Sequence, residues 1–193
     1  AQQEVPENYR KETLIGLPQQ MALHAFKQLF AVIGLHAHIT LGHMHGGLRI
    51  AARDLGVIMR MLMAGGVHGG QRLLQGATLE RMFARHWSYD GVGGNGNPLG
   101  SILSPRGFGN AHYPDRPGLR LAPGFDAVGH LGDAYGLRSV FAMDRARGHG
   151  VVVLAGGTGT DPAATPGRET ALARYEERIV AALHRRAILG LAD

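Results

Sequence analysis

The chain has 193 residues with 45% apolar and 18% charged side chains, which is typical of a globular protein with one sizeable core rather than of a disordered chain. It contains no cysteine, which excludes disulfides, thiolate metal sites and a cysteine nucleophile. The basic residues behind the net charge of +5 are scattered, so we expect no nucleic-acid partner, and no apolar run reaches the roughly 18 residues of a transmembrane helix.

Residues 1–87 are predicted to be mainly helical. Apolar residues that recur at helical spacing predict three helices, at 21–34, 51–64 and 79–87. Gly65 and Gly66 end the second helix, whose first position lacks the Ser or Thr that would cap it. A His- and Gly-rich loop at 36–47 and a short element at 71–74 separate the helices.

The second half of the chain is predicted to be mainly strands. Residues 88–124 lose all periodicity and predict a long loop region with short strands. Alternating or continuous apolar residues then predict antiparallel strands within 125–155, at 125–130, 136–143 and 151–154. A last helix is predicted at 168–189, with Leu172, Tyr175, Ile179 and Leu183 on its apolar face. Helices, antiparallel strands and a final helix predict an α+β fold, an antiparallel sheet flanked by helices.

Two patterns suggest ligand sites that their context does not support. Residues 91–96 match the GxGxxG of dinucleotide-binding loops, but no predicted strand precedes them and no helix follows. Four histidines, His36, His38, His43 and His45, could ligate zinc or copper. The nearest acid in the sequence is Asp54, so we interpret them as polar loop residues and predict no metal and no cofactor.

Three segments carry a family resemblance. Residues 46–55 have the sequence GGLRIAARDL, residues 64–74 AGGVHGGQRLL, and residues 129–139 GHLGDAYGLRS. In this order and spacing they resemble the serine hydrolases of the β-lactamase and penicillin-binding-protein superfamily, and most closely its class C-like branch of esterases and D-amino-acid peptidases. The resemblance covers roughly residues 14–187. It implies acyl-enzyme chemistry on an ester, amide or lactam.

The resemblance also implies a site at residues 130–135. His130-Leu131-Gly132 stands where the family has a Lys- or His-Thr/Ser-Gly triplet on a strand that lines the active site. It implies that His130 supplies a polar or cationic group, that Gly132 allows close approach, and that the backbone N–H of Asp133 forms half of an oxyanion hole. Leu131 and Tyr135 would contact the substrate. A structural strand-end histidine is the alternative for His130.

The sequence departs from the family at the nucleophile. The family's Ser-x-x-Lys is absent, because the two lysines, Lys11 and Lys27, follow Asn8 and His24 by three residues. Tyr9 is a displaced candidate for the tyrosine of the family's Tyr-x-Asn. Leu131 lacks the hydroxyl that helps β-lactamases bind the substrate carboxylate, which favours neutral esters or amides.

Two hypotheses follow from these departures. In the first, residues 1–193 are a single domain or the C-terminal part of one β-lactamase-like domain that is incomplete on its N-terminal side and inactive alone. A partner chain or a second copy would then complete its sheet. In the second, the chain is a short, catalytically inactive homologue that acts as a binding or regulatory module. The first residues show no signal-peptide pattern, while the resemblance suggests a periplasmic or secreted protein and leaves a cytoplasmic one open.

Overall fold

The structure is a computed structural model that describes residues 38–39, 48–89, 105–134, 136–157, 159 and 164–191. The chain divides into two compact units, Ala1–Ile50 and Ala51–Asp193. In the first unit, strands β1 (His38–Ile39) and β2 (Leu48–Arg49) pair antiparallel. The helix predicted at 21–34 and the GxGxxG segment lie outside the described residues.

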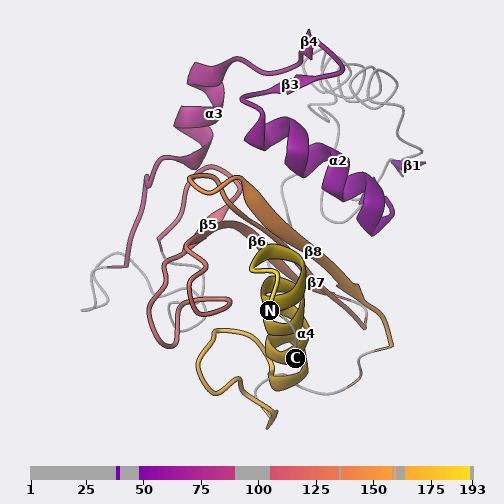
Figure 1. The fold of residues 1–193 in the computed structure, drawn as a ribbon, viewed down its shortest axis with the longest axis vertical. Helices are drawn as coiled ribbons and strands as arrows, with labels where there is room; N and C mark the ends of the chain where they lie inside the picture. The colour runs from indigo at the N-terminus through magenta and orange to yellow at the C-terminus, as the bar shows by residue number, and fades with distance from the viewer. Residues whose placement is uncertain are drawn as a thin grey trace, which may run out of the picture. The chain divides into compact units, whose positions relative to one another are not determined.

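The second unit contains a four-stranded antiparallel sheet in the order β5-β6-β7-β8, with helices before and after it (Figure 1). This arrangement confirms the predicted α+β class. Its elements are α2 (Ala52–Met63), β3 (Val67–His68), β4 (Gln71–Arg72), α3 (Gly76–Phe83), β5 (Ala111–Tyr113), β6 (Ala127–Ala134), β7 (Leu137–Asp144), β8 (His149–Ala155), α4 (Arg174–Leu183) and the π-helix η4 (His184–Ile188). No helix in the described part of the chain is long and apolar enough to cross a membrane.

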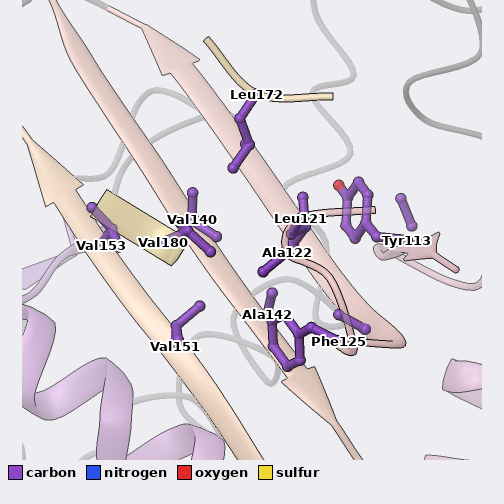
Figure 2. Close-up of a cluster of buried hydrophobic side chains, with 12 residues drawn as sticks. Tyr113, Leu121, Ala122, Phe125, Val140, Ala142, Val151, Val153, Leu172 and Val180 are labelled. Carbon is purple, nitrogen blue, oxygen red and sulfur yellow. The ribbon is translucent and has the colours of Figure 1, made fainter. Parts of the chain in front are cut away.

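The two faces of the sheet have separate cores because successive strand residues point to opposite sides. On one face, which we call the α4 face, Val140 and Ala142 of β7 belong to a cluster that includes Val180 of α4. Figure 2 shows this cluster, in which the side chain of Phe125 lies beside Ala142 of the sheet and Leu172 also belongs to the cluster. On the other face, the α2 face, Met143 of β7 packs with residues of α2 and α3.

Helix α2 packs closely against the sheet at a glycine of β8. A Cβ atom at Gly150 of β8 would lie 2.4 Å from the sulfur of Met59 in α2, so no larger residue fits there. The helix itself forms where its periodicity predicts, and it ends before Gly65 and Gly66. Its N-cap residue, Ala51, makes no side-chain capping hydrogen bond, as predicted.

The boundaries predicted for one strand and two helices are wrong. Strand β6 starts after Phe125 and extends to Ala134, so the segment 131–134 is strand rather than connection. Trp87 lies beyond the end of α3 and pairs with Arg106 through the backbone. Helix α4 begins at Arg174 rather than near residue 168, and the preceding segment is held by contacts to the helix.

The predicted apolar face of the last helix is also wrong. Ile179 and Leu183 are 37% and 39% exposed, while the buried face carries Glu176, Glu177 and Val180. The carboxylate of Glu177 accepts hydrogen bonds from the N–H groups of Glu169 and Thr170 and from the Thr170 hydroxyl. Although burial raises the pKa of Glu177, these bonds outweigh it and lower the pKa. Hydrogen-bonded carboxylates therefore lie on the buried face of α4, where the sequence predicted apolar side chains.

Candidate functional site

The C-terminal half of β6 has one open edge. On one side β6 pairs with β7 along its whole length, from Val128 opposite Met143 to Ala134 opposite Leu137. On the other side β5 pairs only as far as Gly129. Among the described residues, no strand lies beside the outer edge of β6 from residue 130 onward. An extended ligand could therefore hydrogen-bond to this edge.

His130, Gly132 and Ser139 come together on the α2 face beside this edge. Positions 130 and 132 alternate with Leu131 along the strand, so the His130 side chain and the open space at Gly132 lie on one face. Gly132 lies directly opposite Ser139 of β7, and a Cβ atom at position 132 would be 2.3 Å from the Ser139 hydroxyl oxygen. The hydroxyl thus uses the space that the glycine leaves.

The imidazole of His130 is exposed and has a preferred tautomer. Its Nδ1 makes a hydrogen bond with the backbone carbonyl of Leu131. A carbonyl oxygen only accepts hydrogen bonds, so Nδ1 carries the proton in the neutral ring. The lone pair of Nε2 then remains available to accept a proton or a hydrogen bond.

The side chain of Asp133 lies on the α4 face, away from His130. Its carboxylate pairs with Arg138 at 2.5 Å, and Arg138 also pairs with Glu176 of α4 at 3.2 Å. Burial lowers the pKa of Arg138, but the charges of Glu176 and Asp133 outweigh it and raise the pKa. Asp133 is thereby tied to α4, and only its backbone is available at the open edge.

The backbone N–H of Asp133 is expected to point to the open edge. Ala134 of β6 lies opposite Leu137 of β7, and only two residues separate them in the chain. The closing pair of such a hairpin exchanges backbone hydrogen bonds, so the Ala134 N–H points toward β7. Because successive N–H groups of a strand point to opposite sides, the Asp133 N–H points away from β7, toward the open edge.

The other predicted site residues are not brought to this place. Leu131 packs against the core cluster of the α4 face, opposite His130. Tyr9 and Tyr135 lie outside the described residues, as do His36, His43 and His45, and of His38 only the strand position is described. Within the described ranges, no group of three or more His, Asp or Glu side chains could hold a metal ion.

Two features of the site were not predicted from the sequence. Ser139 ends the quoted segment 129–139 and lies in a predicted strand, but it is not predicted as a site residue, although a hairpin register that pairs Gly132 with Ser139 would have identified it. The Arg138–Glu176 pair joins residues 38 positions apart, and no local pattern indicates it.

Comparison with known proteins finds no match. No protein-family model matches the sequence, and neither a curated protein nor a solved structure is found to be similar. The resemblance to serine hydrolases therefore rests on the three quoted sequence segments alone.

Proposed function

We propose that residues 130–133 form the carbonyl-binding side of an acyl-transfer site in a serine hydrolase related to β-lactamases and penicillin-binding proteins. The observation that carries the proposal is the open edge of β6, at which His130 and Gly132 share one face and the Asp133 N–H is directed outward. The substrate class is a neutral ester or amide.

Each residue has a separate role in this proposal. The Asp133 N–H donates a hydrogen bond to the substrate carbonyl oxygen, which gains negative charge as the acyl carbon is attacked. Gly132 lets the substrate approach the strand closely, because no side chain stands between them. Nε2 of His130 accepts or returns a proton beside the reacting carbonyl. Arg138 and Glu176 act as positioning residues. Through the Asp133 side chain, which lies on the α4 face, they link the end of β6 to α4.

The nucleophile is proposed to come from outside this chain. A Ser-x-x-Lys nucleophile needs a lysine three residues after a serine, and neither Lys11 nor Lys27 meets this requirement. Ser139 lies near the site, but no lysine is spaced to activate it. We therefore expect the isolated chain to bind acyl compounds at this edge without turning them over.

Two measurements on the 193-residue chain test the proposal. A fluorophosphonate probe should label no serine, and p-nitrophenyl acetate should give no burst of p-nitrophenol. In amide NMR spectra, a slowly hydrolysed neutral ester should shift the Asp133 and Gly132 signals more than those of α2. Labelling of Ser139 would place the nucleophile in this chain and contradict the proposal. Absence of any shift at Asp133 would remove the edge as a carbonyl site.

A natural product that carries an upstream Ser-x-x-Lys allows a test of turnover. There His130→Ala should lower kcat by about 100-fold, the usual contribution of a general acid or base. The matched control is His68→Ala on strand β3, which should leave kcat unchanged. If intact mass shows that the natural product lacks such a segment, the binding-module hypothesis replaces the hydrolase.

We further propose that another strand completes the sheet at β8. Among the described residues β8 is an edge strand, and its sequence HGVVVLA has no Lys, Glu or Pro to discourage pairing. The partner strand belongs to another chain or to a second copy of this one.

A further inference from the structure

Two histidines from distant parts of the chain meet inside the α4 face. His149 is the first residue of β8 and His184 the first residue of η4, and their ring centroids are 5.9 Å apart. The ring of Phe125 lies 5.6 Å from the first and 5.3 Å from the second. His184 is only 2% exposed, so the end of the C-terminal helix is anchored by a buried imidazole.

The acidic groups around this pair are already engaged. Asp144, opposite His149 in the β7–β8 hairpin, accepts a 2.7 Å hydrogen bond from the Arg147 side chain and a 3.0 Å one from its N–H. Asp115 accepts hydrogen bonds from the Gly124 N–H at 3.0 Å and from Arg120 at 3.3 Å. Among the described residues, neither His149 Nε2 nor His184 Nε2 has a hydrogen-bond partner. A proton added to either ring would find no acceptor.

The net electrostatic environment disfavours a charged His184. Burial lowers the pKa of His184, and the charges of His149 and Arg147 lower it further. Asp115 and Asp144 act in the opposite direction but do not compensate. The docked helix therefore favours the neutral form of the His184 imidazole.

We propose that His149 and His184 form an acid-sensitive clasp that holds α4 and η4 on the sheet at neutral pH and releases them in mild acid. Above the ordinary histidine pKa of 6.5 the His184 ring is neutral whether the helix is docked or released, and the clasp is closed. As the pH falls below 6.5, released His184 takes up a proton that the docked ring resists, so release becomes more favourable. Repulsion between the cationic His184 ring and Arg147 opposes redocking.

Release of the helix would also alter the edge of β6. Glu176 of α4 holds Arg138, which in turn holds Asp133 next to Gly132. When α4 leaves the sheet, Arg138 loses one of its two carboxylates and the end of β6 loses its link to the helix. This regulatory consequence rests on the proposed function, whereas the clasp itself does not.

Hydrogen exchange followed by mass spectrometry tests the clasp in the full chain. Between pH 7.5 and pH 5.0, after correction for intrinsic exchange, protection of residues 174–188 should fall about 10-fold and that of α2 should not change. In His184→Phe, which keeps an aromatic ring beside Phe125 but cannot be protonated, the fall should be smaller than 3-fold. The matched control is His86→Phe, because His86 is exposed and stacks on Phe108. It should behave like the original chain.

Several results would overturn the clasp. Unchanged protection of 174–188 at pH 5.0, or an equal fall in α2, would show that no local release occurs. A fall of full size in His184→Phe would exclude the imidazole as its cause. If His184→Phe does not fold, NMR titration of the original chain decides: a His184 ring that titrates near 6.5 without change in the helix signals contradicts the clasp. Release without any change in ester-induced shifts at Asp133 would disprove only the link to the proposed site.

Discussion

At the scale of single residues, two glycines of β6 differ in the atoms that an added Cβ would meet. A Cβ atom at Gly129 would lie 1.9 Å from the backbone oxygen of Phe141, which the sheet holds in place. The one at Gly132 would meet only the hydroxyl of Ser139, which can rotate about its χ1 bond. Gly129 therefore serves the fold, whereas Gly132 leaves space at the candidate site that a rotatable hydroxyl occupies.

We expect Gly129→Ala to lower the free energy of unfolding by about 3 kcal/mol, the upper range for overpacking against rigid atoms. Gly132→Ala should cost about 1 kcal/mol or less, because the hydroxyl can turn away and alanine is favoured over glycine in a strand. Urea denaturation monitored by circular dichroism measures both. In a Ser139→Ala background the cost of Gly132→Ala should vanish. Equal destabilisation by the two alanines would contradict this distinction.

At the scale of elements, α4 is attached to the sheet by charge as well as by apolar contact. The side chains of Arg138 and Glu176 are 11% and 5% exposed, and Glu176 also accepts the Ala173 N–H at 3.0 Å. A single carboxylate thus begins the helix and binds it to β7. Sequence periodicity cannot indicate such an attachment, because it treats a glutamate as a solvent-facing residue.

Glu176→Gln should destabilise the protein by about 3 kcal/mol, because it leaves the Arg138 charge buried with one partner fewer. The matched control is Glu80→Gln, which breaks a more exposed ion pair, with Arg145, whose two side chains are 70% and 30% exposed. That change should cost less than about 1 kcal/mol. Thermal and urea unfolding of both variants test the comparison, and equal losses would show that the Arg138–Glu176 pair does not anchor α4.

At the scale of the whole molecule, β8 bears on the oligomeric state, because among the described residues it has no neighbouring strand on its outer side. Leu154 of β8 and Leu137 of β7 lie on the same face, and they are 36% and 44% exposed. Only Leu154 is on the edge strand. Apolar side chains next to an unprotected edge favour association with another strand.

We expect the chain to self-associate with increasing concentration in light scattering and sedimentation measurements. Leu154→Lys, which places a charge on the edge strand, should weaken this association about 10-fold. Leu137→Lys changes the same face by the same charge but leaves the edge intact, so it should have a smaller effect. A monomer at all concentrations, or equal effects of the two lysines, would argue against pairing through β8.

The α+β class, the β7–β8 hairpin and helix α2 could be predicted because each depends on local periodicity and turn residues. The C-terminal limit of β6 and the buried face of α4 could not, since both depend on partners far along the chain. His130 and Gly132 were predicted as neighbours, and β-strand alternation places them on one face. Ser139 required the register between β6 and β7, which the sequence leaves undetermined.

The connectivity of the sheet has a kinetic consequence. Strands β6, β7 and β8 follow one another in the chain and pair in that order, so most sheet contacts join residues close in sequence. Chains with such local contacts form them quickly, because little loop entropy is lost before the pairing energy is gained. The three-stranded meander is therefore expected to form early, and the C-terminal helix to dock on it as a later step.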